Sequence, residues 1–373
     1  MHTMKTILTI ISLSCGLALA GSPDRARQHA RAYDAAYAQW VEDVSIAPDN
    51  DEQNAAWLRR PNGLEAGRLV WEEIRGNLAD AWMLEHAAWF LTNVSEFAVA
   101  KPKARVNGRV GSSPAALIRD AVFEHHLRSP KVGSYCIGLT HVEDPQAMRL
   151  LEMVEKVNKD HAVRGAAALA QAILHRRLGG GKFGMRIRQE KLRIAIKAPD
   201  LTVGKTTTLA ILDDEVFRMT RLNMSTVAPD FRGIEVTQKI SSLSDNKGKV
   251  MILFFWHSLM PTLQDSLALF RKYREEFEGK DIVILGVNMD NPLTLREHIA
   301  EGTVTWKNFS DSTQTISKLY RIETWPFVYV LDEEHKIRYS GAPGAFVKIT
   351  AEDLEKQLAA RKAAVLEKAK PGE

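Results

Sequence analysis

Apolar side chains recur every three to four positions through the first half of the chain, which is the period of an α-helix. In the segment 77–94, this repeat places Ala81, Leu84, Ala88 and Leu91 on one helix face. Segments 24–44, 114–127, 145–160 and 161–178 are also rich in helix-forming residues. The pattern therefore predicts several amphipathic helices in succession.

The residues between these segments are typical of helix ends. Ser113 is a good N-cap and Pro114 suits the first helical position, while glycines 179–181 would stop the last helix. We therefore predict an all-α domain over residues 21–181. Helix pairs joined by short loops are typical of a bundle or of a TPR- or HEAT-like array, but the spacing shows no fixed period, so the type of repeat stays open.

The pattern changes at about residue 227. Two continuous apolar runs, 250–256 and 281–288, flank an amphipathic segment at 262–279, which predicts a strand–helix–strand unit of a parallel sheet. Residues 327–332 and 336–341 read as a hairpin, and 351–369 as a terminal helix. We predict an α/β domain over 227–365, with a mixed central sheet flanked by helices, and a short tail at 366–373.

Residues 182–226 lie between the two domains. Their pattern predicts a basic linker or hairpin, although the same pattern also fits a helix. The basic positions are Arg186, Arg188, Lys191, Arg193 and Lys197. The simplest interpretation is a solvated face. The functional alternative is contact with an anionic partner or, through 186–197, with a membrane surface.

The first 20 residues have the pattern of a secretory signal. Lys5 precedes an apolar run at 6–17, and Ala18-Leu19-Ala20 fits a cleavage site. Cys15 is also a candidate for lipidation, although Ser12 stands where a lipobox has leucine. No other stretch approaches the ~18 apolar residues of a membrane helix. We expect an exported protein of the periplasm or cell envelope.

Composition narrows the class of protein. The 373 residues are 45% hydrophobic and 26% charged, which is typical of globular domains and excludes a disordered chain. Lys and Arg number 50 against 46 Asp and Glu, a net charge of +4 that does not favour nucleic acid. Only Cys15 and Cys136 are present, so cleavage of the signal leaves one thiol and no internal disulfide.

The segments 227–231, 243–245 and 247–250, followed by the strand ending in Trp256, resemble the thioredoxin-like redoxins. This family includes exported thiol–disulfide reductases and their alkyl hydroperoxide reductase relatives. The resemblance covers about a third of the chain and extends to Trp325-Pro326, where the family has a cis-proline. It implies a thioredoxin-like fold for 227–365 and, in the family, reduction of disulfides or peroxides.

The sequence departs from the family at the reactive positions. Where reductases have Cys-x-x-Cys, this chain has Met260 and Leu263. The peroxiredoxin alignment also places its cysteine at Met260, with His257 and Leu253 where threonine and proline belong. A thioether has no ionisable proton and cannot form a mixed disulfide. We therefore predict a degenerate, redox-inactive site.

Two interpretations of this site remain. Residues 258–263 can be a helix start kept for packing. Alternatively, the family's peptide groove persists without thiols. Its candidate lining is Trp256, His257, Pro261, Trp325 and Pro326. Ser258 has no clear acid partner in the sequence, so a serine nucleophile is not expected there.

Other candidate chemistry is weak. Cys136 lies in an apolar stretch and reads as a buried small hydrophobe. Glu124, His125, His126 and His141 lack metal-ligand spacing, so we expect neither a metal nor a cofactor.

The sequence thus predicts an exported redoxin-fold binding or scaffold module with a protein or peptide partner and no nucleic acid. The alternative is an active antioxidant or thiol–disulfide oxidoreductase that uses Cys136 or a partner's cysteines. The oligomeric state stays open.

Overall fold

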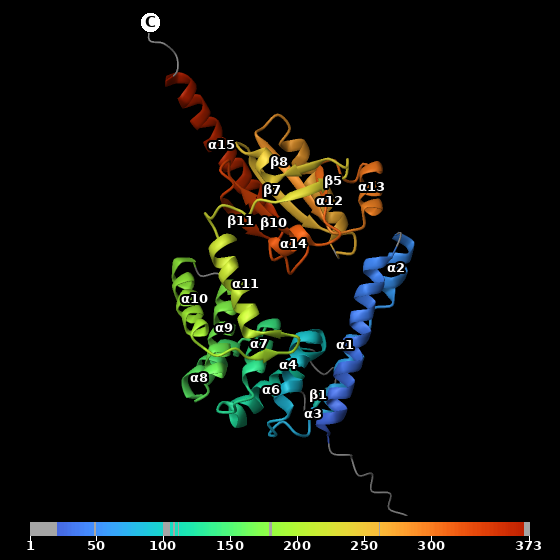
Figure 1. Ribbon diagram of the computed structural model, residues 1–373, viewed down its shortest axis with the longest axis vertical. Helices are drawn as coiled ribbons and strands as arrows, with labels where there is room; N and C mark the ends of the chain where they lie inside the picture. Colours follow the sequence, from blue (N-terminus) through green and yellow to red (C-terminus); the bar gives the residue numbers. More distant parts are fainter. Residues whose placement is uncertain are drawn as a thin grey trace, which may run out of the picture. The chain divides into compact units, whose positions relative to one another are not determined.

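The computed structural model describes residues 21–47, 50–99, 105–106, 109–110, 112–178, 181–260 and 262–368. The chain divides into two compact units (Figure 1). Unit 1 comprises the residues up to Tyr37 together with Pro61–Lys205, and unit 2 comprises Ala38–Arg60 together with Thr206–Glu373. The predicted signal peptide and residues 369–373 of the predicted tail lie outside the described residues.

Unit 1 is helical, as the apolar periodicity predicts. Its helices are α3 (Gly63–Ile74), α4 (Met83–Asn93), α5 (Ser95–Val99), α6 (Pro114–Ala121), α7 (Gly133–Gly138), α8 (Ala147–Val157), α9 (His161–Leu178) and α10 (Gly181–Ile196), with a π-helical turn at Val122–His126 and a 3-10 turn at Leu139–His141. Strands β1 (Arg105–Val106) and β2 (Arg109–Val110) form a small antiparallel pair, an addition to the predicted all-α domain.

Two local features of unit 1 follow directly from its sequence. Ser113 Oγ accepts a hydrogen bond of 3.3 Å from the Ala116 N–H, and Pro114 occupies the first turn of α6, so the predicted cap is confirmed. Helix α9 is rich in alanine and buried along most of its length. A Cβ on Gly165 of α9 would lie 2.1 Å from the Ala198 Cβ, so a larger residue cannot take this position.

The predicted domain boundaries differ from the structure. The helix α1 (Pro23–Ile46) runs from unit 1 into the segment that belongs to unit 2, and α2 (Asn50–Leu58) belongs to unit 2. Most of residues 182–226 is helical, as the helix alternative predicts, because they form α10 in unit 1 and α11 (Thr208–Arg221) in unit 2. Only the short strands β3 (Thr202–Val203) and β4 (Thr206–Thr207) are extended there.

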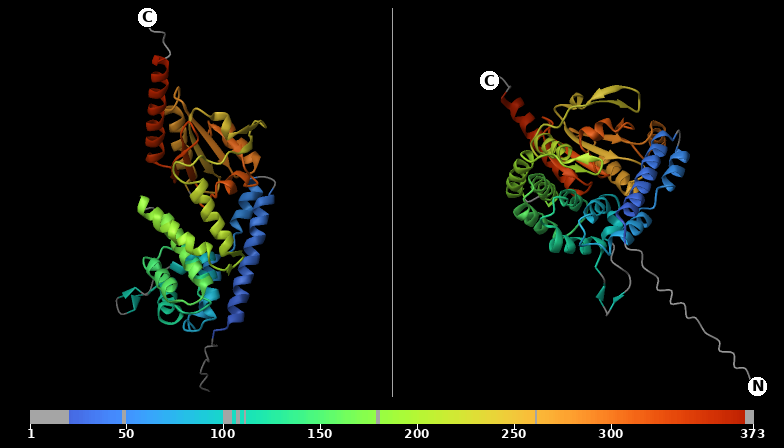
Figure 2. Two further views of the ribbon diagram at one scale, coloured as in Figure 1. Left: turned by 60° about the vertical axis from the view of Figure 1, so that its left-hand side comes forward. Right: turned by 60° about the horizontal axis from the view of Figure 1, so that its bottom comes forward.

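Unit 2 is built on a mixed sheet with helices on both faces (Figure 2). Its seven strands lie in the order β11 (Ile337–Gly341), β10 (Phe327–Leu331), β7 (Val250–Trp256), β8 (Ile282–Asn288), β9 (Lys307–Ser310), β5 (Arg232–Glu235) and β6 (Ile240–Ser242). Neighbours in the central set β7, β8 and β9 are parallel, and the remaining pairs are antiparallel. The predicted parallel core is thus confirmed.

The continuous apolar run of β7 is buried on both faces of the sheet. Alternate residues from Val250 to Trp256 pack against α12 (Leu263–Glu276) and α15 (Ala345–Lys368). The intervening residues Met251, Leu253 and Phe255 pack on the opposite face, where α14 (Thr315–Leu319) lies. A strand buried on both faces needs apolar residues at every position, which explains why its sequence shows no alternation. Helix α13 (Pro292–Ala300) follows β8.

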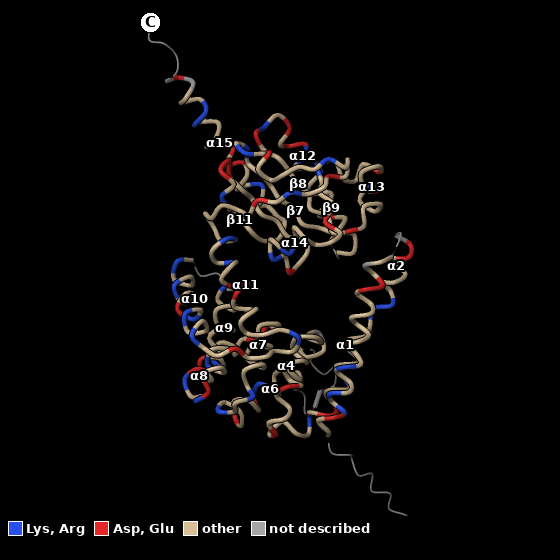
Figure 3. Tube along the Cα trace, viewed as in Figure 1, with Lys and Arg blue, Asp and Glu red and all other residues tan. Residues whose placement is uncertain are grey.

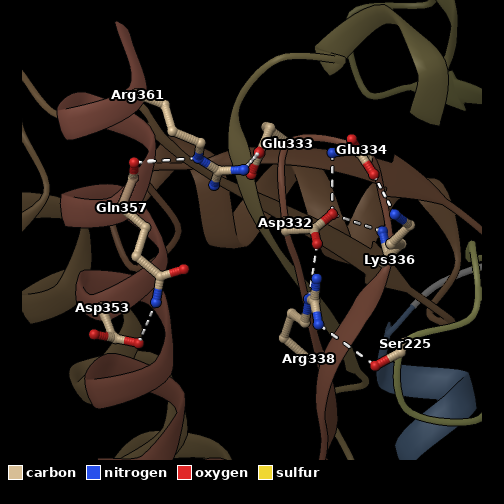
Figure 4. Close-up of polar contacts among 9 residues, drawn as sticks. All are labelled: Ser225, Asp332, Glu333, Glu334, Lys336, Arg338, Asp353, Gln357 and Arg361. Carbon is tan, nitrogen blue, oxygen red and sulfur yellow. Dashed lines mark hydrogen bonds and ion pairs between the residues drawn. The ribbon is translucent and has the colours of Figure 1, made fainter. Parts of the chain in front are cut away.

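The hairpin between β10 and β11 is closed by Asp332 (Figure 4). Its carboxylate accepts the main-chain N–H groups of Glu334 and Lys336 at 3.0 and 2.9 Å, and the Arg338 Nε–H at 2.7 Å. These contacts satisfy a buried carboxylate and fix the turn that the sequence predicts. In the part of the chain that the structure describes, no helix is both long and apolar enough to span a bilayer.

Candidate functional site

The resemblance to the redoxins aligns the two reactive cysteines of the family with Met260, just before α12, and with Leu263, the first residue of α12. Met260 is 3% exposed and packs in the core cluster of α12, and Leu263 packs against the same cluster. Both side chains therefore serve the hydrophobic core at the helix start. Pro261, one of the predicted groove residues, lies outside the described residues.

Trp256, the last residue of β7, is fully buried. Its indole Nε1–H donates to Asn308 Oδ1 at 3.0 Å. The same amide oxygen would lie 1.7 Å from a Cβ placed on Gly286 of the neighbouring strand β8. Trp256 is thus a core residue with a satisfied polar group, and it does not line an accessible groove as predicted.

His257 lies at the partly exposed rim of this segment. Its Nδ1 accepts the Leu259 N–H at 3.1 Å, so the neutral ring carries its proton on Nε2. Burial lowers the pKa of His257 below the ordinary histidine value, and the charge of Asp290 opposes this effect only in part. The imidazole ring contacts the Trp325 ring edge-to-face, with centroids 5.7 Å apart.

The peptide bond between Trp325 and Pro326 is cis, as the resemblance implies. Both residues are partly exposed. The segment before them is held by Arg218 of α11, whose guanidinium donates to the Arg321 carbonyl at 2.7 Å and to Glu323 Oε1 at 2.6 Å. The structure therefore brings together His257, Trp325 and Pro326 of the five predicted groove residues.

Ser258 has two polar partners that the sequence did not reveal. Its hydroxyl donates to Asp290 Oδ2 at 2.7 Å, and His298 Nε2 lies 3.0 Å from the same oxygen. The Ser258 N–H also donates to the Asp290 carboxylate at 2.9 Å, and Asn288 Nδ2–H donates to it at 2.8 Å. The expectation that Ser258 lacks an acid partner is thus wrong.

The signal for this cluster was available in the strand pattern. Residues 257–258 follow β7, and Asn288 and Asp290 stand at the end of β8 or just after it. The two strands are parallel, with Trp256 opposite Asn288, so the residues that follow them meet at one edge of the sheet. His298 comes from the next helix, α13, and its approach depends on packing that periodicity does not specify.

The cluster is not arranged for acyl transfer. In a catalytic triad the carboxylate binds and orients the histidine, whereas here Asp290 accepts from Ser258 itself and His298 Nδ1 lies 3.2 Å from Thr303 Oγ1. The nearby N–H groups of Ser258, Leu259 and Met260 are engaged by Asp290, His257 Nδ1 and the His257 carbonyl. None of these three is left for an oxyanion. The network holds the turn between β7 and α12.

Cys136 lies within α7 of unit 1 and is fully buried. Burial raises the pKa of its thiol to about 12, because the interior disfavours the thiolate. A thiolate is the reactive form of cysteine, so this group is inert in the folded unit.

The remaining candidates are used structurally or dispersed. His126 Nε2 lies 2.8 Å from the Leu78 carbonyl. No group of three or more metal-ligating side chains occurs among the described residues. In the basic run of 186–197, Arg188 is buried and Lys191 pairs with Glu155 at 2.8 Å, so these two residues do not belong to an exposed basic face.

Comparison with known sequences concerns unit 2. Residues 224–340 match the AhpC/TSA family. A protein named as the peroxiredoxin Bcp of Haemophilus influenzae is 25% identical over 105 residues, 28% of this chain and 68% of that protein. The thiol-disulfide oxidoreductase ResA of Oceanobacillus iheyensis is 25% identical over 130 residues, 34% of this chain and 65% of that protein. The matches thus span about two thirds of each relative.

Similar solved structures also align with a third of the chain. The thioredoxin domain of a thiol-disulfide oxidoreductase from Bacteroides vulgatus is 25% identical, with 36% of this chain and 98% of that chain covered and a TM-score of 0.33. A thiol:disulfide interchange protein from Bacteroides sp. is 25% identical, with 36% and 91% covered and a TM-score of 0.33. The family match, the mixed sheet and the cis-proline agree, and residues 224–340 belong to the thioredoxin-like redoxin family.

Proposed function

We propose that this protein is a redoxin-fold binding or scaffold module that carries out no thiol chemistry. The observation that carries the proposal is the core packing of Met260 and Leu263 at the start of α12, the positions where a redoxin reductase holds its two cysteines. A buried thioether and a leucine can neither attack nor resolve a disulfide.

The partner is a protein or peptide. In support, the half-buried Trp325 and Pro326 adjoin the imidazole of His257 on the rim of unit 2. A partly solvent-exposed aromatic ring suits contact with an extended peptide. The main chain of such a peptide can form hydrogen bonds with the backbone beside the cis bond. Nucleic acid is not expected, because the net charge of +4 is small for a chain of 373 residues.

We also propose that the protein is exported to the periplasm or cell envelope. The support is the sequence of residues 1–20, in which a lysine, an apolar run and an Ala-x-Ala site occur in the order of a secretory signal.

The alternative, a working thiol–disulfide oxidoreductase or antioxidant, draws on the names of the relatives. It requires either the cysteines of another protein or Cys136 in reactive form. The burial of Cys136 and its pKa of about 12 argue against the second route.

The test is dithiothreitol-dependent turnover of a disulfide protein and of hydrogen peroxide, with the parent chain and Cys136→Ala side by side. An active redoxin reductase serves as the positive control. We expect no turnover by either chain. Turnover that disappears in Cys136→Ala would establish the Cys136 thiol as the nucleophile. Turnover that persists in Cys136→Ala would show that the protein reduces its substrate without this thiol. Either result overturns the proposal.

A further inference from the structure

Helix α10 presents a narrow row of cations on its outer face. Lys182, Arg186, Arg193 and Lys197 are spaced by four, seven and four residues along the helix and the residue that follows it. At 100° per residue these four side chains fall within about 60° of one another. The buried residues Gly184, Arg188, Leu192 and Ala195 fall on the opposite side, and Figure 3 shows the basic segments along α10.

These four cations are available for a partner. Each is exposed, and within the described part of the chain none of them forms an ion pair. The other two basic residues of the run differ, because Arg188 is buried and Lys191 pairs with Glu155. Glu190 is the one acidic residue of α10, and it lies at the edge of the row.

Large apolar side chains flank the row. Phe183, in the first turn of α10, is 73% exposed, and Leu178, the last residue of α9, is 75% exposed. Only residues 179–180 separate the two helices, so both side chains lie at the same end of the helix pair. Ile196 at the far end of α10 is 59% exposed. Exposed aromatic and aliphatic residues beside cations are typical of helices that lie in a lipid interface.

We propose that the outer face of α10 docks unit 1 on an anionic membrane surface. The four cations contact lipid phosphates, while Phe183 and Leu178 insert at the boundary of headgroups and acyl chains. The proposal concerns unit 1 and does not depend on the function of the redoxin unit.

The apolar flank is what favours a membrane over other anionic partners. A nucleic acid or an acidic protein would use the cations and gain little from a phenylalanine and a leucine at one end of the row. A lipid interface uses both. Each Lys or Arg near an anionic surface contributes about a fivefold gain in partitioning, and this gain falls as salt screens the charge.

The test is sedimentation of the chain without its predicted signal, residues 21–373, with vesicles of phosphatidylglycerol and phosphatidylethanolamine, and with vesicles of phosphatidylcholine alone. We expect binding to the anionic vesicles only, weakened by high salt. Arg186→Gln/Arg193→Gln should weaken it about 30-fold. Phe183→Ser should weaken it as well without changing the charge.

The matched control is Arg128→Gln/Arg296→Gln, which removes two exposed cations elsewhere and gives the same net charge. Circular dichroism verifies the helix content of each variant. No binding to anionic vesicles, or equal losses in the α10 and control variants, overturns the proposal. Phe183→Ser that binds like the parent also overturns it, and so does tighter binding to a DNA duplex or to polyglutamate than to vesicles.

Discussion

Two buried sulfur atoms in different units of this protein show how position and reactivity can be separated. The resemblance to the redoxins aligns Met260 with the family's nucleophile, but its buried thioether has no proton to lose. Cys136 has such a proton, yet it lies inside α7 of unit 1 and is fully buried. The fold alone therefore does not establish thiol chemistry, because the chemistry requires a thiol at the right place and in an accessible environment.

Introducing two cysteines into unit 2 should change the chemistry of the protein most. In a Cys15→Ala background, Met260→Cys/Leu263→Cys should form a disulfide under oxidising conditions and gain measurable reductase turnover. The i, i+3 spacing at the start of α12 is that of the family's motif. Alkylation with and without reductant, followed by mass spectrometry, counts the thiols. Each single variant is the control, and three free thiols in the oxidised double variant after denaturation, Cys136 included, would contradict the placement.

A second test concerns the thiol of unit 1. With a pKa of about 12, roughly one Cys136 thiol in ten thousand is ionised at pH 8. In the Cys15→Ala chain, labelling by Ellman's reagent should be at least about 1000-fold slower in the folded protein than in guanidinium chloride. Rapid labelling under native conditions would contradict the burial of this side chain.

The third test concerns the polar network around Ser258. Asp290→Ala leaves the Ser258 N–H, its hydroxyl and the Asn288 amide without their acceptor. We expect a loss of about 2–4 kcal/mol in the free energy of unfolding, measured by urea titration. Asp265→Ala removes an exposed carboxylate of α12 and should cost less than about 1 kcal/mol. Equal losses would contradict a structural role for the network.

The smallest expected effect is a change in pH dependence. Burial lowers the pKa of His257 in the folded state, so below about pH 6.5 the unfolded chain binds a proton that the folded chain does not. Stability should therefore fall as pH decreases from 6.5 towards the lowered pKa. His257→Gln should reduce the slope of the unfolding free energy against pH, by an amount that corresponds to less than one bound proton. Urea titrations between pH 5 and 8 measure it, and an unchanged slope would refute the assignment.

The sequence predicts the elements whose own residues determine them. The apolar run 250–256 forms a strand buried on both faces, Ser113 and Pro114 begin α6, and the cis bond at Pro326 follows from the family resemblance. The sequence of α10 does not distinguish a helix from a strand, because its alternation of basic and apolar residues also fits an extended segment. Its burial against α9 decides in favour of a helix.

The polar network around Ser258 could be predicted only in part, because its groups come from segments that are distant in the sequence. Asp290 and His298 follow Ser258 by 32 and 40 residues, and only the parallel pairing of β7 with β8 brings them to the same edge. The burial of Trp256 does not follow from the sequence for a related reason. Its partner Asn308 lies in β9, so the sequence around the tryptophan does not show that its N–H is satisfied inside the core.

The close approach around Gly286 also restricts how this fold can diverge. A methyl group at position 286 would overlap the Asn308 amide, which in turn accepts the Trp256 indole. A larger residue at 286 therefore requires a smaller or differently placed one at 308, and that change leaves the indole without its acceptor. Positions 256, 286 and 308 should consequently covary in descendants of this chain, whereas exposed positions of the same strands are free to change independently.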